Sequence, residues 1–210
     1  MPIVPQARDV LLVVDMQNDF LPGGSLAVAD GHAITAPITR LAPRFANLVM
    51  TQDWHPPGHI SFASSHSGKQ PFESIELAYG TQLLWPDHCV KGTPGAAFAP
   101  GLDLPGAQLV IRKGYHPHVD SYSGFREVDH ATVTGLAGYL RERRLERLFL
   151  CGLATDFCVH WTALDGRLEG FEVFVIEDLC RGIDTGGSLA KAWADMEAAG
   201  VERITAADIG

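Results

Sequence analysis

The sequence contains few cysteines and no paired cysteine motif. Its 210 residues include four cysteines, Cys89, Cys151, Cys158 and Cys180. Their spacings contain no Cys-x-x-Cys pair and no pattern typical of a disulfide framework. In a reducing compartment we expect all four to be free thiols. The remaining question is which of the four thiols reacts.

Long apolar runs and basic charge are also scarce. No run is long enough to span a bilayer, and the apolar run that ends at Asp15 is too short for a signal peptide. The sequence therefore predicts a cytoplasmic protein. Its 16 Lys and Arg against 25 Asp and Glu give a formal net charge of -9. This charge argues against nucleic-acid and anionic-membrane partners, and it leaves a small-molecule substrate and a homo-oligomer open.

The composition is that of an ordinary globular protein, with 46% hydrophobic and 20% charged residues. The length predicts one domain over residues 1–210. Residues 53–107 are rich in Pro, Gly, His and Trp and show little periodicity. So long a connection inside a domain is usually functional or disordered. Because it contains four histidines and two tryptophans, we interpret it as functional.

Six short apolar runs predict β-strands, at residues 10–14, 47–51, 108–112, 147–151, 172–176 and 203–205. Such runs are typical of parallel strands covered on both faces. Helices are expected between them, at residues 32–46, 129–143, 156–169 and 188–199. In the last helix, Ser188 is the expected N-cap and Gly200 the expected stop. The alternation predicts an α/β fold, an open doubly wound six-stranded parallel sheet with helices on both faces in a Rossmann-like three-layer sandwich.

Reactive side chains follow four consecutive predicted strands. Asp15 follows the first, Asp53 and His55 the second, Lys113 the third, and the turn that leads to Cys158 the fourth. In open α/β sheets, ligands bind outside the carboxyl ends of the strands. One charged residue at a strand end is ordinary, but this mixture at four ends predicts a functional site.

Cys158 is the best candidate for a nucleophile. It lies near a predicted helix start, where the helix dipole lowers the pKa of a thiol and free N–H groups can hold an oxyanion. Asp15 could take the thiol proton, and Lys113 could favour the thiolate. The alternatives are a structural cysteine at 158 and a structural ion pair between Asp15 and Lys113. Cys151, in an apolar strand, and Cys180, on a loop after the fifth strand, fit a structural role.

Asp53-Trp54-His55 is a possible metal motif, because positions i and i+2 of an extended segment point to the same side. His88 is the most plausible third ligand, with Cys89 beside it. Three protein ligands leave open positions for substrate, and this set suits zinc, iron or manganese. We expect four other histidines to be surface or loop residues: His59, His66, His116 and His118.

Three sets of segments occur in order between Asp9 and Thr205: residues 15–24 (DMQNDFLPGG), 113–114 with 121–125 (KG and SYSGF), and 152–159 (GLATDFCV). In this order they resemble the motifs of a known family, the isochorismatase-like cysteine hydrolases. Residues 51–56 (TQDWHP) and 85–90 (WPDHCV) are similar to its nicotinamidase branch. The resemblance implies that residues 53–107 are a metal- and substrate-binding insertion.

The resemblance implies a set of site residues. It implies a catalytic triad of Asp15, Lys113 and Cys158, and one divalent metal ion, zinc before iron or manganese, on Asp53, His55 and His88. It implies a cis peptide before Ala154, with the N–H groups of Ala154 and Cys158 as the oxyanion hole, and a substrate ring bound by Phe20, Trp85 and Tyr122. Some relatives have a further histidine ligand eight residues after the aspartate. That position is Ser61 here, with His59 the nearest histidine, so a fourth protein ligand stays open.

The function implied by the resemblance is hydrolysis of nicotinamide to nicotinic acid and ammonia through a thioester on Cys158, in NAD salvage. Pyrazinamide is expected as a second substrate. In this hypothesis the pyridine nitrogen ligates the metal. One alternative is a related cysteine amidohydrolase or isochorismatase with another small substrate. Another is a non-catalytic metal- or thiol-binding module, such as a redox sensor.

Overall fold

Six parallel strands form the central sheet of the computed structural model, which describes residues 2–210. They are β1 (Asp9–Val14), β2 (Asn47–Asp53), β5 (Leu109–Lys113), β6 (Arg147–Leu153), β7 (Glu172–Arg181) and β8 (Glu202–Ile204). Their order in the sheet is β5-β2-β1-β6-β7-β8, and every neighbouring pair is parallel. The predicted open parallel sheet is confirmed, and each predicted strand overlaps an observed one.

Two neighbouring inner strands, β1 and β2, are buried along their whole length. Every residue of β1 and of β2 is buried, because both faces of a parallel sheet are covered by other elements. The edge strand β5 differs, since its side chains alternate between exposed and buried and Val110 is 42% exposed. The near-continuous apolar runs of the sequence therefore mark the centre of the sheet.

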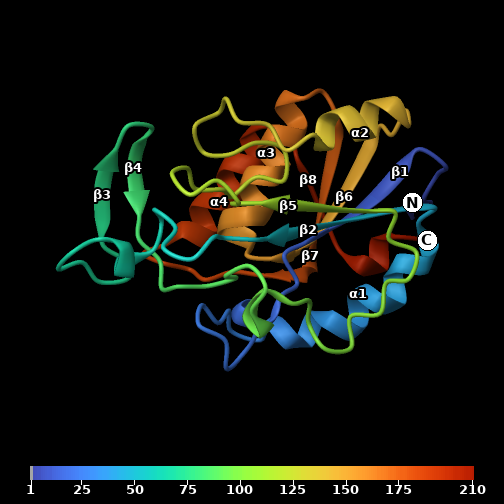
Figure 1. The fold of residues 1–210 in the computed structure, drawn as a ribbon. Coiled ribbons are helices and arrows are strands. Elements are labelled where there is room, and N and C mark those ends of the chain that lie inside the picture. The colour runs from blue at the N-terminus through green and yellow to red at the C-terminus, as the bar shows by residue number, and fades with distance from the viewer. Residues whose placement is uncertain (1) are drawn as a thin grey trace.

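Helices cover both faces of the sheet, as predicted. They are α1 (Thr35–Leu41), α2 (Leu136–Glu142), α3 (His160–Leu168) and α4 (Ser188–Ala198). Figure 1 shows α2, α3 and α4 on one face and α1 on the other. None of these helices, over the described part of the chain, combines the length and the apolar character that a membrane crossing needs.

Three of the four helices are shorter than the sequence predicts. Helix α1 lies between two 3-10 turns, Gly31–Ile34 and Ala42–Arg44, and Pro43 is in the second. Helix α2 begins only after Gly135, whose φ is 95°. Helix α3 is preceded by a π-helical turn, Thr155–Val159. Prolines and left-handed glycines end or delay helices, so apolar periodicity alone overestimates their length.

The predicted N-cap of α4 is wrong, although its predicted end is right. The N-cap position is Gly187, in the left-handed region, and no side chain caps the helix. The Ser188 hydroxyl donates instead to Asp156 Oδ2, at 2.5 Å. Gly200 follows the last turn with φ 78°, the left-handed conformation that stops a helix.

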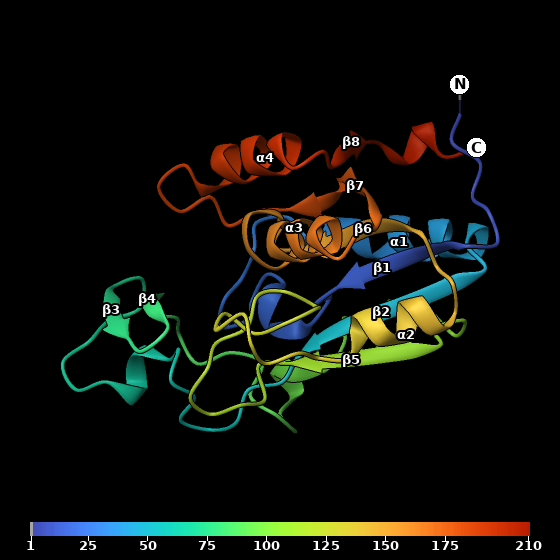
Figure 2. The same ribbon diagram turned by 90° about the horizontal axis from the view of Figure 1, so that it is seen from above.

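A two-stranded antiparallel hairpin lies inside the 53–107 segment. Its strands are β3 (Ser74–Leu77) and β4 (Gly80–Leu83), and it stands apart from the sheet in Figures 1 and 2. Most of its side chains are partly or fully exposed. Because its strands have four residues each and few apolar side chains, the apolar pattern of the sequence does not reveal it.

The placement of Cys180 also corrects the sequence prediction. Strand β7 runs on to Arg181, and the β6–β7 register shifts between Leu150 and Gly152. Cys180 therefore lies in a strand and is buried. A strand that continues through such an irregularity is longer than its apolar core.

The sheet changes direction between β1 and β6. The chain goes from β1 outward to β2 and β5, returns to β6 beside β1, and then continues outward to β7 and β8. Ligands of open α/β sheets bind at such a switch point, outside the carboxyl ends of the strands. Asp15 directly follows β1 here, and Ala154 directly follows β6.

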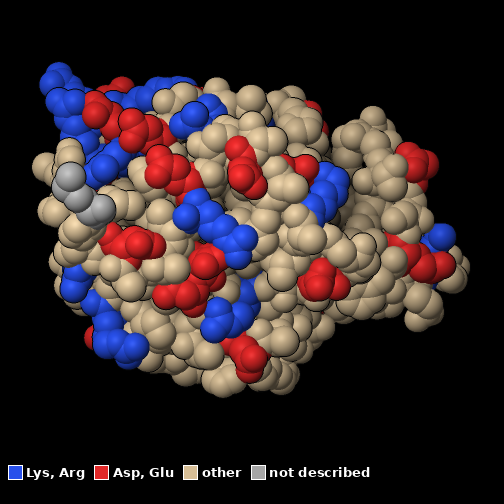
Figure 3. Space-filling view, turned by 180° about the vertical axis from the view of Figure 1, so that it is seen from behind, with Lys and Arg blue, Asp and Glu red and all other residues tan. Residues whose placement is uncertain are grey.

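The two ends of the chain lie close together, and the charged side chains are spread over the surface. A parallel bridge joins Ile3 to Ile209, and the two termini lie side by side in Figure 2. On the face seen in Figure 3, Lys and Arg side chains are interspersed with Asp and Glu. The acidic excess is thus not gathered into one region of that face.

We predict that Gly152→Ala strongly lowers the free energy of unfolding. Gly152 has φ 120°, and an added Cβ would lie against the β1 backbone, 2.8 Å from Val14 N. We expect a loss of at least about 2 kcal/mol in urea titrations. The matched control is Gly138→Ala in α2, where a Cβ would meet open space. It should gain about 0.5 kcal/mol, and equal effects of the two variants would contradict this account.

Candidate active site

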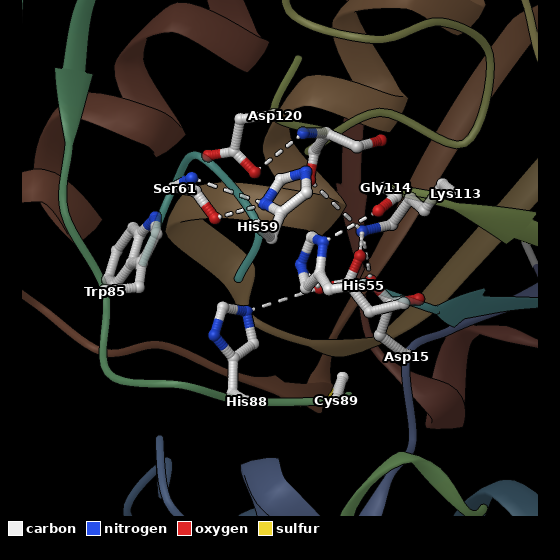
Figure 4. A network of polar contacts seen from close by, with 12 residues as sticks. Asp15, His55, His59, Ser61, Trp85, His88, Cys89, Lys113, Gly114 and Asp120 are labelled. Carbon is white, nitrogen blue, oxygen red and sulfur yellow. Dashed lines mark hydrogen bonds and ion pairs between the residues drawn. The ribbon is translucent and has the colours of Figure 1, made fainter. Parts of the chain in front are cut away.

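A buried lysine joins the groups that follow three neighbouring strands. Lys113, at the end of β5, is 0% exposed. Its Nζ lies 2.8 Å from Asp15 Oδ2 and 2.7 Å from Asp53 Oδ1, and 3.4 Å from Cys158 Sγ. Figure 4 shows the lysine pointing toward Asp15. The structure thus brings together residues that the sequence predicts to meet.

The charges of this cluster depend on one another. Burial alone lowers the pKa of Lys113, but Asp15 and Asp53 outweigh it and hold that pKa well above its ordinary value. Burial raises the pKa of Asp53, but Lys113 and His55 outweigh it and hold that pKa well below its ordinary value. Burial raises the pKa of Asp15 in spite of Lys113. Asp15 is therefore the carboxylate better able to accept a proton.

Cys158 lies in the π-helical turn before α3, which begins at His160. The sequence predicts a lowered thiol pKa here, but the structure shows the reverse. Burial raises the pKa of Cys158 well above its ordinary value, and Lys113 only partly offsets this effect. The reacting atoms of Asp15, Asp53 and Cys158 lie within 4.8 Å of one another. A protonated thiol next to a carboxylate needs that carboxylate as its base.

Thr51 orients the Asp15 carboxylate, a contact that the sequence analysis did not anticipate. Asp15 has φ 44°, and its backbone N–H donates to Thr51 Oγ1 at 3.1 Å. The Thr51 hydroxyl in turn donates to Asp15 Oδ1 at 2.6 Å. Thr51 lies two residues before Asp53 on β2, so its side chain points to the same side of the strand.

The other three cysteines are buried. Burial raises the pKa of Cys180 to about 12, and it raises the pKa values of Cys89 and Cys151 well above their ordinary value. Cys89 lies beside His88 in Figure 4, and its backbone N–H donates to Asp19 Oδ2 at 2.7 Å. Among the four thiols, Cys158 is the one in contact with Lys113.

The predicted metal ligands converge in a buried cluster. Asp53 Oδ2 lies 3.3 Å from His55 Nε2 and 3.6 Å from His88 Nε2. His55 Nδ1 donates to the Gly114 carbonyl at 2.9 Å, and His88 Nδ1 donates to the Pro86 carbonyl at 2.8 Å. Both rings therefore direct Nε2 toward Asp53, and each Nε2 would offer a lone pair to a bound cation. One carboxylate and two such imidazoles fit a divalent cation with open coordination positions.

His59 lies in a loop, as predicted, but it is not on the surface. It is fully buried, and its ring lies 4.3 Å from that of His55. Nε2 donates to the His116 and Val119 carbonyls at 2.8 and 3.1 Å, while Nδ1 accepts from the Ser61 hydroxyl at 2.8 Å. Burial and His55 lower the pKa of His59 to about 4. Both ring nitrogens thus have hydrogen-bond partners in the loops that surround His59.

Aromatic side chains form the walls of a cavity that reaches Cys158. Phe20, Trp85 and Tyr122 all line it, as does Ala154. Trp85 Nε1 donates to the Tyr122 hydroxyl at 3.0 Å. The Leu153–Ala154 peptide bond is cis, as the resemblance implies. Ligand cavities are commonly lined in this way, by apolar and aromatic side chains with a few polar groups among them.

Two further residues of the π-helical turn Thr155–Val159 help to form this cavity, and nothing in the sequence indicated their roles. The Phe157 ring packs edge-on against Trp85, with ring centroids 4.8 Å apart. The Asp156 carboxylate accepts from the backbone N–H groups of Ile183 and Asp184, at 2.9 and 2.8 Å. Ile183 lines the cavity, so Asp156 ties the β7–α4 loop to the site.

Comparison with known proteins agrees with this geometry. Residues 9–208 match the isochorismatase domain. The chain belongs to the isochorismatase family. A relative within this family, a nicotinamidase from Acinetobacter baylyi, is 56% identical over 199 residues, which cover 95% of this chain and 93% of the relative.

Two solved structures of similar proteins contain bound groups. PnC1 from L. infantum in complex with nicotinate is 38% identical, with a TM-score of 0.88, and the match covers 100% of this chain and 99% of that one. The pyrazinamidase of Pyrococcus horikoshii in complex with zinc is 36% identical, with a TM-score of 0.78 and coverage of 94% and 99%. The predicted fold and family resemblance are thus confirmed.

We predict that the purified protein binds one divalent metal ion per chain. His88→Ala should lower the bound zinc by at least about tenfold after dialysis, because the site loses one of its three ligands. Metal per chain is measured by elemental mass spectrometry. His118→Ala, which removes an exposed histidine, is the control and should keep wild-type zinc. Equal zinc in both variants would contradict the assignment.

Proposed function

We propose that the chain is an amidohydrolase that converts nicotinamide to nicotinic acid and ammonia, a reaction of NAD salvage. Pyrazinamide is a second substrate. The observation that carries the proposal is the contact of Lys113 with Asp15, Asp53 and Cys158 at one end of an aromatic cavity. The identity of 56% to a nicotinamidase over 95% of the chain supports the substrate.

The proposed reaction begins with proton transfer from the Cys158 thiol to Asp15. The sulfur attacks the carboxamide carbon, and a tetrahedral oxyanion forms. Asp15 then gives its proton to the departing nitrogen, the carbon–nitrogen bond breaks, and ammonia leaves a thioester on Cys158. Water hydrolyses the thioester with Asp15 as base again, which releases the acid and the thiol. Lys113 keeps Asp15 and Cys158 in contact through both half-reactions.

We assign the N–H groups of Ala154 and Cys158 to the oxyanion hole and Phe20, Trp85 and Tyr122 to the substrate ring. Ala154, Cys158 and the three aromatic residues line one cavity, which supports both assignments. Preorganised backbone donors at the developing charge commonly contribute about 100- to 1000-fold to the rate.

Asp53, His55 and His88 would hold one divalent ion, and we propose zinc as its identity. The zinc complex of the Pyrococcus horikoshii relative supports this choice, while iron and manganese suit the same ligands. A bound divalent ion supplies a Lewis acid to which the ring nitrogen of the substrate can coordinate. We also propose that residues 1–210 form one catalytic domain, in which the 53–107 segment contributes Trp85 and His88.

The decisive experiment measures ammonia release from nicotinamide, pyrazinamide and acetamide. We expect turnover of the two aromatic amides and much slower turnover of acetamide, because acetamide cannot fill the aromatic cavity. Faster turnover of acetamide than of nicotinamide and pyrazinamide would favour an amidohydrolase with another substrate. No turnover of any amide would favour a non-catalytic metal- or thiol-binding module.

Cys158→Ala should lower nicotinamide turnover by at least about 10,000-fold, because the nucleophile is lost. The matched control is Cys151→Ala, which removes a buried thiol from β6 that lies outside the proposed catalytic groups. Its turnover should stay within about threefold of the wild type. Comparable activity of Cys158→Ala and the wild type would end the thioester mechanism.

A further inference from the structure

A buried carboxyl group next to the site has no part in the proposed reaction. Glu127 lies in the segment between β5 and α2 and is only 1% exposed. Its backbone N–H donates to the Thr132 carbonyl at 2.8 Å, and its own carbonyl accepts from His130 N–H at 3.0 Å. The backbone around Glu127 is thus held in place. Burying a carboxyl group costs free energy. The contacts of the Glu127 carboxyl group therefore indicate its role.

The carboxyl group of Glu127 contacts the residue that follows Lys113. Gly114 N–H donates to Glu127 Oε1 at 3.3 Å, while Glu127 Oε2 has no hydrogen-bond partner among the described residues. Gly114 is buried, so without Glu127 this N–H would be in a region away from bulk water. Glu127 is therefore the side-chain acceptor for Gly114.

Gly114 in turn contacts the metal cluster. Its φ is 69°, and an added Cβ would collide with the His55 ring. In this left-handed conformation the Gly114 carbonyl faces His55 and accepts the hydrogen bond from His55 Nδ1 at 2.9 Å. Figure 4 shows Gly114 next to His55 and adjacent to Lys113. Glycine has the widest range of backbone conformations, so the hydrogen bonds to Glu127 and His55 decide which conformation Gly114 adopts.

We propose that Glu127 is a positioning residue of the metal site, which acts through Gly114 on His55. Glu127 holds the Gly114 N–H, the Gly114 carbonyl holds His55 Nδ1–H, and His55 Nε2 is thereby directed toward Asp53 and His88. Partners behind a metal ligand fix its tautomer and ring orientation, and their loss typically lowers metal affinity about 10- to 100-fold. This inference rests on the proposed metal site.

The test measures zinc affinity by competition with a chromogenic chelator, without substrate. Glu127→Met keeps a side chain of similar length and volume but removes the acceptor, and it should weaken zinc binding about 10- to 100-fold. Glu127→Gln keeps an acceptor oxygen, so its affinity should return to within about threefold of the wild type. An unchanged zinc affinity of Glu127→Met, with native circular dichroism, would overturn the inference.

Controls separate this role from a general loss of stability. Asp9→Asn removes a buried charge that pairs with Arg147 at the opposite end of β1, and it should lower the melting temperature without changing zinc affinity. If Glu127→Met does not fold, Glu127→Asp replaces it, because its carboxylate is one methylene shorter and cannot reach Gly114. Glu127→Asp should also bind zinc more weakly than the wild type. Wild-type zinc affinity of Glu127→Asp would overturn the inference. Wild-type protein that does not bind zinc would contradict the metal site itself, and the inference with it.

Discussion

The site depends on one buried ammonium group and on how its charge is compensated. Lys113 is inaccessible to water and lies against two carboxylates and one thiol. A buried charge is tolerated only when it is paired and hydrogen-bonded. Asp15 and Asp53 supply that compensation from the ends of β1 and β2. Strand β2 lies between β1 and β5, the strand that ends with Lys113. The two carboxylates differ in protonation, since Asp53 stays ionised beside His55 and His88 while Asp15 can accept a proton.

Much of this arrangement could be predicted because it follows from strand order and residue type. The apolar runs identify six strands, and polar residues directly after them must lie at one edge of a parallel sheet. Asp15, Asp53, Lys113 and Cys158 therefore meet as predicted, and Asp53, His55 and His88 form the expected cluster. The roles that we assign to these residues remain proposals, whereas their proximity is a property of the fold.

What could not be predicted depends on burial and on contacts between distant loops. A histidine in a polar segment is typical of a surface, yet His59 is enclosed by the carbonyls of His116 and Val119. The thiol pKa of Cys158 is raised because burial, together with Asp15 and Asp53, outweighs Lys113. The contact of Glu127 with Gly114 joins residues of an irregular segment whose path no periodicity describes.

The central claim is that the Lys113 ammonium lowers the pKa of the Cys158 thiol and so partly offsets the effect of burial. The most direct measurement is the pH dependence of Cys158 alkylation by iodoacetamide, in the wild type and in Lys113→Met, with Cys158→Ala as background. Loss of the ammonium leaves burial, Asp15 and Asp53 to raise the thiol pKa. In Lys113→Met, the midpoint of the pH dependence of Cys158 alkylation should therefore lie about one pH unit or more above that of the wild type. The same midpoint in both proteins would contradict this claim.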